Sequence, residues 1–375
     1  MTDDRKQQPE RANSMPNILW LTKRRYMNKD LLRDRYGRYY ELPVRLAEKG
    51  IRIHMLLLSY RKEFTESLEV NDHFHIYSID IRRGWKYLLR TCQIIREKNV
   101  QLIVASSDIP FCVLGARLAR QHKLPLICDI YDDFDTYASK RIPGLKFLYY
   151  RALTRSDTNV VFESLLAEYL KSRTRNDNYR VIPNTVDEKI FRPLGRADCQ
   201  NRLGLDSEAK WIGYFGAISA NRGIQILFDA WRKVKAEIPN ARLLLAGKAD
   251  SGIALNEEGM VYLGEVPHDE VPYLINSCDV CVMCHHGNFA KYSFPVKCFE
   301  YIACRRPFVA PAVGGIVPFL GQHSDCLYRA GDSRRLAEKL KALLSKSEFT
   351  FPQIMTLSEA VDLYADIIRE AIHNS

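Results

Sequence analysis

Residues 211–225 read WIGYFGAISANRGIQ, and this stretch indicates the fold more clearly than any other. The apolar run at 211–215 predicts a buried strand that ends at Gly216. A loop containing Arg222 then leads into 224–236, where apolar residues recur with the period of an α-helix. A strand, a glycine-bearing turn and a helix form the repeating unit of parallel α/β sheets.

The same alternation of short β-branched runs and helical patterns extends along almost the whole chain. It predicts two Rossmann-like, doubly wound parallel-sheet α/β domains that face each other across a cleft. The remaining expected strands are 17–22, 51–58, 73–79, 101–105, 125–130, 158–162, 179–183, 241–245, 260–263, 280–283 and 307–310. The remaining expected helices are 40–49, 87–98, 111–121, 145–154, 270–277, 295–303, 333–345 and 356–373.

A chain of 375 residues is long enough for two domains of ordinary size. Turn-forming residues at 183–187 end the first alternating region, and 191–195 are predicted to form a linker. We expect a disordered tail at 1–15, an N-terminal acceptor-side domain at 16–190 and a C-terminal nucleotide-binding domain at 191–355. The last helix, within 356–375, is expected to pack back on the N-terminal domain.

Composition restricts the cellular setting. The first 15 residues are polar and lack the apolar core of a secretory signal. No run approaches the ~20 apolar residues that span a bilayer, so we expect a cytoplasmic protein, peripheral at the inner membrane face. The 10 cysteines lie mostly in apolar runs, and Cys281 and Cys284 belong to a strand pattern. Reduced, buried thiols and no metal site are therefore predicted.

The formal net charge is +10, and nearly all of the excess precedes residue 191. It is concentrated at 23–38 and 82–90. One-sided charge of this kind predicts an anionic partner, either membrane lipid or a phosphate-bearing acceptor. The alternative is ordinary solvated surface charge. Nucleic acid is not expected, because no recognised binding motif accompanies the charge.

Residues 294–303, FPVKCFEYIA, carry the most informative chemistry. Ser293 is a plausible cap, and Pro295 suits the first turn of a helix. Lys297 and Glu300 are three residues apart and therefore share one helical face. A cation in the first turn fits a diphosphate, and a carboxylate one turn deeper can accept hydrogen bonds from two ribose hydroxyls. The alternative is a surface ion pair on an amphipathic helix.

Two further segments follow predicted strands. Gly216 permits close backbone approach, and Arg222 could clamp a phosphate. Gly314 and Gly315 form a turn after the strand at 307–310, where backbone N–H groups could face a ligand. Each alone is equally an ordinary turn. Since all three segments follow strand ends of one domain, we expect them to line one cleft.

With these residues in view, the C-terminal half resembles family 4 of the retaining glycosyltransferases, which have the architecture called GT-B. The family pattern places a proline, a lysine, Glu-Tyr and a second proline in the order of Pro295, Lys297, Glu300-Tyr301 and Pro307. Residues 182–187 resemble the hinge of the family, and 129–133 resemble its strand ending in Asp-x-His-Asp. The resemblance covers roughly 125–345.

The resemblance implies roles for particular residues, beginning with Arg222 and Lys297, which would neutralise the diphosphate leaving group. Glu300 would hold the ribose hydroxyls. Gly216 at the strand end and the second turn, with Gly314, Gly315 and Ile316, would adjoin the donor. Asp132 and Asp133 of the N-terminal domain would lie near the transferred sugar.

The resemblance also implies the reaction. It would be metal-independent, need no cofactor and retain anomeric configuration. A hexose-type sugar would pass from a UDP-sugar or GDP-sugar to a glycan or lipid-linked acceptor in polysaccharide biosynthesis.

Three departures from the family pattern leave alternatives open. Tyr292 stands where the family often has a first glutamate, Ala217 where it has arginine, and Tyr131 where it has histidine. One alternative is a catalytically impaired scaffold or assembly subunit. A second is a sugar-nucleotide epimerase or phosphorylase of the same architecture.

Overall fold

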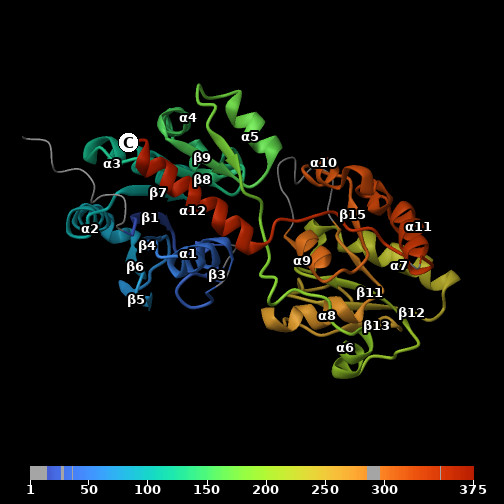
Figure 1. The fold of residues 1–375 in the computed structure, drawn as a ribbon. Helices are drawn as coiled ribbons and strands as arrows, with labels where there is room; N and C mark the ends of the chain where they lie inside the picture. The colour runs from blue at the N-terminus through green and yellow to red at the C-terminus, as the bar shows by residue number, and fades with distance from the viewer. Residues whose placement is uncertain (1–14, 27–28, 36, 285–295, 347) are drawn as a thin grey trace, which may run out of the picture. The chain divides into compact units, whose positions relative to one another are not determined.

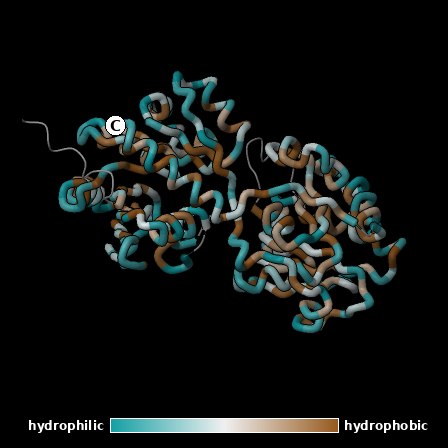
Figure 2. The backbone as a smooth tube through the Cα atoms, viewed as in Figure 1, coloured by the Kyte–Doolittle hydropathy of each residue, from teal (hydrophilic) through white to brown (hydrophobic). Residues whose placement is uncertain are grey.

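The computed structural model describes residues 15–26, 29–35, 37–284, 296–346 and 348–375. It contains two compact units, Met1–Pro183 with Ser358–Ser375, and Asn184–Leu357. Each unit is a sheet with helices around it (Figure 1). Apolar residues concentrate on the strands and on the inner faces of the helices (Figure 2). The fold class predicted from the sequence, two α/β parallel-sheet domains, is confirmed.

The first unit is built on an eight-stranded sheet in the order β10-β9-β8-β7-β1-β4-β6-β5. All neighbouring strands are parallel except β5 and β6. The strands are β1 (Asn17–Lys23), β4 (Arg52–Ser59), β5 (Glu66–Asn71), β6 (Phe74–Asp80), β7 (Leu102–Ser106), β8 (Leu126–Ile130), β9 (Thr158–Val161) and β10 (Tyr179–Val181).

The antiparallel edge strand β5 departs from the predicted all-parallel sheet. Its residues are half-buried or exposed, as is usual for an edge strand, so the sequence lacks the apolar run that marks the others. The chain reverses at 72–73, where Asn71 Oδ1 accepts a hydrogen bond of 3.0 Å from the His73 amide. Asparagine favours such turns because its side chain bonds the backbone two residues on.

Helices cover both faces of this sheet (Figure 1). One face carries α1 and α12, which an ion pair joins between Lys49 and Asp362 at 2.5 Å. The other carries α2 and α3, whose rings Tyr87 and Phe111 lie 6.5 Å apart, and then α4. The helices are α1 (Arg38–Glu48), α2 (Gly84–Glu97), α3 (Ile109–His122), α4 (Leu145–Arg155), α5 (Ser164–Lys171) and α12 (Leu357–His373), with short η2 (Ile81–Arg83), η3 (Phe134–Thr136) and η4 (Ala138–Arg141).

A buried carboxylate ties the C-terminal helix to this unit. Asp129, near the end of β8, accepts a hydrogen bond of 3.2 Å from the hydroxyl of Tyr364 on α12 and pairs with Arg38 of α1 at 3.4 Å. Arg38 also donates to the backbone carbonyls of Ile182 and Pro183, at 3.0 and 3.2 Å. One ion pair therefore fixes two helices and the last segment of the unit around a single strand end.

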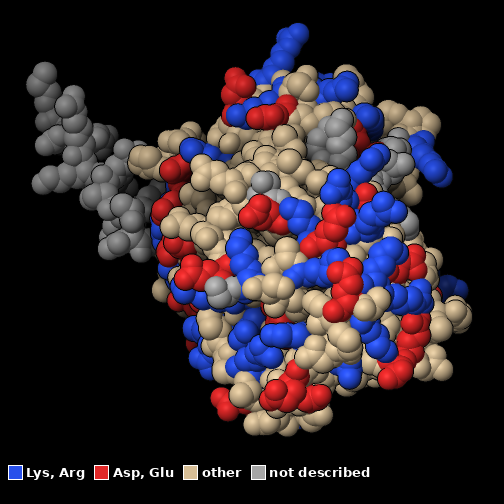
Figure 3. All heavy atoms as spheres, turned by 90° about the vertical axis from the view of Figure 1, so that its right-hand side faces the viewer, with Lys and Arg blue, Asp and Glu red and all other residues tan. Residues whose placement is uncertain are grey.

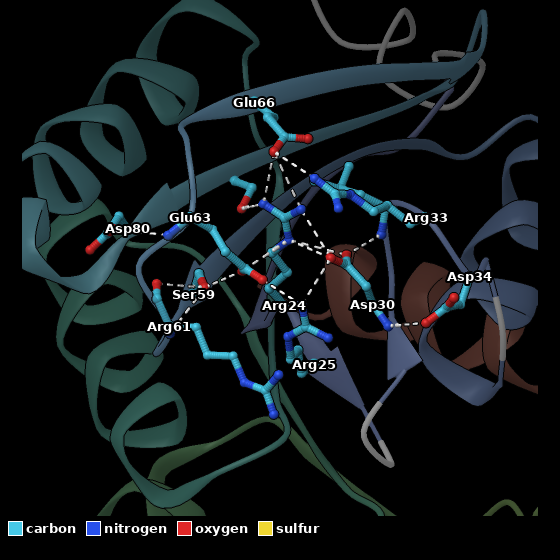
Figure 4. A network of polar contacts seen from close by, with 12 residues as sticks. Arg24, Arg25, Asp30, Arg33, Asp34, Ser59, Arg61, Glu63, Glu66 and Asp80 are labelled. Carbon is cyan, nitrogen blue, oxygen red and sulfur yellow. Dashed lines mark hydrogen bonds and ion pairs between the residues drawn. The ribbon is translucent and has the colours of Figure 1, made fainter.

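A second ionic network surrounds Arg24, which follows β1 and is fully buried (Figure 4). Its guanidinium pairs with Asp30 at 3.0 Å, Glu63 at 3.3 Å and Glu66 at 3.4 Å. Burial alone would raise the pKa of Asp30, but its bonds to Arg24 and to the Leu32 amide, together with the charges of Arg24 and Arg25, outweigh burial and lower that pKa. Asp30 belongs to the short hairpin of β2 (Arg25–Tyr26) and β3 (Lys29–Asp30).

These two networks correct one prediction from the sequence. Arg24 and Arg38 belong to the basic cluster at 23–38 that was expected to meet an anionic partner, yet both are buried in ion pairs inside the unit. Arg25 is likewise paired, with Glu63 at 2.5 Å. A net charge read from sequence counts these groups as available, whereas the fold neutralises them internally.

The second unit is a six-stranded, wholly parallel sheet in the order β13-β12-β11-β14-β15-β16. Trp231 of α7 is buried in its core with Leu243 and Leu340. The strands are β11 (Lys210–Phe215), β12 (Ala241–Ala246), β13 (Met260–Tyr262), β14 (Val280–Val282), β15 (Phe308–Pro311) and β16 (Leu327–Tyr328). The helices are α6 (Arg196–Leu203), α7 (Ile224–Glu237), α8 (Val271–Ser277), α9 (Lys297–Ala303), α10 (Ile316–Leu320) and α11 (Ser333–Leu344), with η5 (Ala220–Arg222), η6 (His268–Glu270) and η7 (Gly321–Cys326).

The boundary between the units lies at Pro183, earlier than the expected 190. Residues 191–195, predicted to be a linker, pack on the second unit. Phe191 is buried, and the Leu194 amide donates to Asn276 Oδ1 at 3.0 Å.

On the face of the molecule seen in Figure 3, basic and acidic side chains are intermixed.

We predict that Arg38→Met destabilises the first unit by about 3–5 kcal/mol, because the change leaves Asp129 buried without its cation. Tyr364→Phe is the matched control: it removes one hydrogen bond to the same carboxylate and should cost only about 1 kcal/mol. The free energy of unfolding from urea titration measures both. Equal losses would show that Asp129 does not depend on Arg38.

Candidate active site

Three segments with predicted site residues follow three neighbouring strands of the second unit. Gly216 follows β11, Lys297 and Glu300 lie on α9 after β14, and Gly314 follows β15. In a parallel sheet the carboxyl ends of adjacent strands share one edge. The fold therefore brings these segments together, although they are far apart in sequence.

A close backbone crossing shapes this edge. Gly216 and Gly247, which follow the paired strands β11 and β12, have φ angles of +154° and +130°. A Cβ on Gly247 would overlap the carbonyl oxygen of Gly216, so no larger residue fits at 247 without moving the backbone. The loops then continue side by side, with the Ile218 amide donating to the Lys248 carbonyl at 2.8 Å.

Lys297 occupies the space that the missing side chain of Gly216 leaves. Its Cε and Nζ both lie 2.6 Å from where a Cβ on Gly216 would be. The first residue of α9 thus aims its ammonium group across the end of β11. A Cβ on Gly216 would displace the end of the lysine side chain, so the glycine permits this position of the cation, and the φ of +154° independently favours glycine there.

Electrostatics separate Lys297 from an ordinary surface lysine. Burial is the main cause that lowers its pKa, and the nearby charge of Arg222 lowers it further, while Glu300 acts in the opposite direction. Arg222 lies exposed at the end of η5. Two cations and one carboxylate thus act on the same place, an arrangement that favours an added anion.

Glu300 is only 7% exposed, which argues against the alternative of a surface ion pair with Lys297. Glu300 nevertheless acts on Lys297, since its charge raises the pKa of that ammonium against the effect of burial. The helix is anchored beside this glutamate by Tyr301, whose hydroxyl donates to the Val282 carbonyl at 3.3 Å. Ser293, Pro295 and Tyr292 lie outside the described residues.

The second glycine turn lies against the same helix. Gly314 has a φ of +51°, Gly315 precedes α10, and Ile316 is fully buried. Phe319 of α10 and Phe299 of α9 place their rings 5.6 Å apart. This contact holds the turn beside the helix that carries Lys297 and Glu300. Ala217, where the family has an arginine, accepts a hydrogen bond from Tyr214 through its carbonyl.

The first unit carries a separate polar cluster at the carboxyl ends of its strands. The Lys23 ammonium, at the end of β1, donates to the Tyr131 hydroxyl at 2.9 Å. The Tyr137 hydroxyl lies 2.7 Å from that of Tyr131 and 3.0 Å from Asp132 Oδ2. Burial lowers the pKa of Lys23, while Asp108 and Asp132 raise it. Asp132 is therefore part of a half-buried network rather than an isolated acid.

Asp133, predicted together with Asp132, has a local structural role. Its Oδ1 accepts a hydrogen bond of 3.0 Å from the Asp135 amide and so caps η3. Lys23, Tyr137 and Asp108 were not predicted as site residues. The position of Lys23 at the end of a buried strand was an available signal, but nothing in the sequence relates it to Asp132.

The cysteines are free thiols, most of them buried. Burial raises the pKa of Cys284 to about 12, which keeps it protonated. Within the described ranges, no group of three or more His, Cys, Asp or Glu side chains is placed to hold a metal ion. No helix among these residues is both long and apolar enough to cross a membrane.

Two parallel-sheet units of this topology define the GT-B architecture, and solved structures share it. Sucrose-phosphate synthase from Thermosynechococcus elongatus has a TM-score of 0.68 and 17% identity, covering 96% of this chain and 94% of that one. Anabaena HepE, solved in complex with UDP, has a TM-score of 0.67 and 16% identity, covering 96% and 98%. At these identities the likeness shows the fold alone.

Family models match each half of the chain. Residues 38–189 match the model described as Glycosyltransferase Family 4, and 209–346 match Glycosyl transferases group 1. Both models describe glycosyltransferases, and together they support the resemblance of the chain to the family 4 glycosyltransferases of GT-B architecture.

The individual proteins to which the chain is similar share less than a third of its residues over the matched regions. D-inositol 3-phosphate glycosyltransferase of Segniliparus rotundus is 29% identical over 182 residues, which is 45% of this chain and 39% of that protein. TuaC of Bacillus subtilis, named as a teichuronic acid biosynthesis glycosyltransferase, is 25% identical over 275 residues, or 72% and 67%. The chain spans 39% of the length of the Segniliparus rotundus protein and 48% of that of the D-inositol 3-phosphate glycosyltransferase of Stackebrandtia nassauensis.

The crossing of the two glycine loops yields a stability prediction. Gly247→Ala should destabilise the second unit by about 3 kcal/mol or more, because its Cβ meets backbone that cannot rotate away. Gly252→Ala is the control: it has a φ of +90° but open space around its Cβ, so only conformational strain of about 1 kcal/mol applies. Urea unfolding measures both, and similar losses would refute the steric argument.

Proposed function

We propose that the protein is a retaining, metal-independent glycosyltransferase. It transfers a hexose-type sugar from a UDP-sugar or GDP-sugar to a hydroxyl of a glycan or lipid-linked acceptor in polysaccharide biosynthesis. The observation that carries the proposal is the half-buried Lys297, with Arg222 near it and Glu300 one helical turn deeper. HepE, which shares the fold, was also solved with UDP-glucose.

The donor would bind with its diphosphate between the two cations. A diphosphate would attract both Lys297 and Arg222, and its negative charge would offset the repulsion that Arg222 exerts on the Lys297 ammonium. Glu300 would accept hydrogen bonds from the ribose hydroxyls. Gly216, Gly314 and Gly315 would allow the phosphates and sugar to approach the backbone, and Ile316 would support that turn from below.

Catalysis would then depend on the departing phosphate. The bond from the anomeric carbon to the phosphate oxygen breaks while the acceptor oxygen attacks from the same face. The leaving phosphate accepts the acceptor proton. The chain supplies no nucleophile in this scheme, and the rate enhancement comes from positioning and from charge stabilisation by Arg222 and Lys297. With two cations on the leaving group, no metal ion is required for that charge.

Asp132 is proposed to orient the transferred sugar or the acceptor. Its Oδ2 already accepts a hydrogen bond from Tyr137, so its free lone pairs can accept others from sugar hydroxyls. Asp133 is retained in the proposal only as the residue that fixes the loop, because its carboxylate caps η3.

A paired binding experiment tests the donor site. Lys297→Ala should weaken binding of both UDP and inorganic pyrophosphate by ~30-fold or more, since each loses one charged phosphate contact. Glu300→Gln should weaken UDP but leave pyrophosphate unchanged, because only UDP has a ribose. Calorimetry measures all four affinities, with Lys233→Ala on the outer face of α7 as control. If Lys297→Ala binds both as tightly as the unaltered chain, the assignment fails.

Product analysis tests the reaction. Incubation with a panel of UDP-hexoses and GDP-hexoses plus oligosaccharide acceptors, in the presence of EDTA, should yield a glycoside with the anomeric configuration of the donor by NMR. Inversion would contradict the retaining mechanism, and loss of transfer in EDTA the metal independence. Nucleotide binding without any turnover would favour the scaffold, and conversion of the donor alone would favour an epimerase.

A further inference from the structure

Helix α2 begins with exposed apolar side chains, although a water-soluble helix normally hides them. Its buried face consists of Tyr87, Thr91, Ile94 and Ile95. Trp85 and Leu89, one turn apart on the opposite face, are 62% and 60% exposed. Ile81 of the preceding η2 is exposed too. The packing of the unit therefore leaves an apolar patch at the N-terminal end of this helix.

A loop distant in sequence extends the patch. Phe64 between β4 and β5 is 87% exposed, and Tyr60 is also exposed. The loop is bonded to the start of η2, because the Glu63 amide donates to Asp80 Oδ2 at 3.2 Å and Asp80 caps η2. The two segments thus present their aromatic side chains from one region of the unit.

Exposed apolar side chains also occur at the beginning of α4. Phe147 is 67% exposed, and Ile142 and Leu148 are exposed beside it. The preceding η4 is bonded to the start of α3, where the Ser139 hydroxyl donates to Asp108 Oδ1 at 2.7 Å. Helices α2, α3 and α4 follow one another along one side of the sheet (Figure 1).

Each of these helices follows a strand, β6, β7 or β8, so their N-terminal ends lie at the carboxyl edge of the sheet. That edge also carries Lys23 and Asp132. We define the amphipathic strip as the exposed side chains of this edge in three segments, 60–64, 81–90 and 138–151.

The charge of the amphipathic strip indicates which kind of partner it can bind. The segments 81–90 and 138–151 contain no acidic residue, and the single acid of 60–64, Glu63, is paired with Arg24 and Arg25. Asp80 and Asp135 compensate Arg82 and Lys146, respectively. The remaining basic side chains border the apolar ones: Arg61, Lys62, Arg83, Lys86, Arg90, Arg141 and Arg151.

Exposed tryptophan and leucine beside lysine and arginine are the composition of surfaces that insert shallowly into anionic membranes. The centre of a protein interface, by contrast, is usually poor in lysine. We infer that the amphipathic strip docks the first unit on an anionic lipid surface, with Trp85, Leu89, Phe64 and Phe147 entering the headgroup region. This goes beyond the proposed transfer reaction and does not depend on it.

Vesicle sedimentation tests the inference. The full chain should sediment with vesicles of phosphatidylcholine and phosphatidylglycerol, but not with phosphatidylcholine alone, and less at high salt. Trp85→Ser with Leu89→Ser should lower the partition coefficient by roughly tenfold or more, and so should Arg83→Glu with Lys86→Glu. Leu263→Ser and Arg334→Glu, exposed positions of the second unit, are the matched controls and should bind normally.

Tryptophan fluorescence reports the contact directly. Of the four tryptophans, Trp20, Trp211 and Trp231 are buried, so Trp85 dominates any change at the surface. Its emission should shift to the blue on anionic vesicles and be quenched by brominated lipid. Trp85→Phe should keep an aromatic anchor, and therefore binding, while the quenching disappears.

Three outcomes would overturn the inference. They are no binding to anionic vesicles, binding that is unchanged in Trp85→Ser with Leu89→Ser, and self-association that this variant abolishes in ultracentrifugation without any vesicle binding. The last result would assign the strip to a second copy of the chain. Calorimetry with UDP on the same variants should give unchanged affinity, which separates this question from that of the donor site.

Discussion

The contact between the Lys297 side chain and the bare backbone of Gly216 is the constraint on which the candidate donor site depends. The Lys297 ammonium can take this position across the end of β11 because Gly216, which follows that strand, has no Cβ to displace it. Gly216 can take its position only because Gly247, on the next strand, leaves room for its carbonyl. Two glycines on adjacent strands and one lysine on a later helix thus form one steric unit.

This arrangement is a local cost to stability. Lys297 is half-buried and lies near Arg222, and burial and this second cation both lower its pKa while Glu300 raises it. Packing elsewhere compensates, through the buried aromatic contacts of α9 with β14 and α10. Arg24 and Arg38 of the first unit differ in this respect, because the buried guanidinium of Arg24 pairs with Asp30 and that of Arg38 pairs with Asp129. The cations with a structural role are thus held in ion pairs, whereas Lys297 is set apart by burial and by the nearby charges of Glu300 and Arg222.

The periodicity of apolar residues in the sequence was sufficient to predict the fold class and most of the strands. Each strand expected from an apolar run has a counterpart within a residue or two, because buried parallel strands need such runs. It missed β5, whose side chains are half-exposed, and α6, which follows directly on a segment expected to be a linker. It also missed the short elements α5, α10 and β16. It could not show that Arg24 and Arg38 of the basic cluster are paired internally, because partners such as Glu63 and Asp129 come from elsewhere in the chain. The network of Lys23, Tyr131 and Asp132 was hidden for the same reason.

The arrangement within the first unit relates two features that the sequence presents separately. The carboxyl edge of its sheet carries both the polar network of Asp132 and the apolar, basic side chains of the amphipathic strip. Strand topology brings them together, because η2 and α2 follow β6 directly and η4, which precedes α4, is bonded to the start of α3. An acceptor held in a membrane by a lipid would meet both features from one direction, whereas a freely soluble glycan would need only the first. Among the proposed acceptor classes, this edge therefore favours the lipid-linked one.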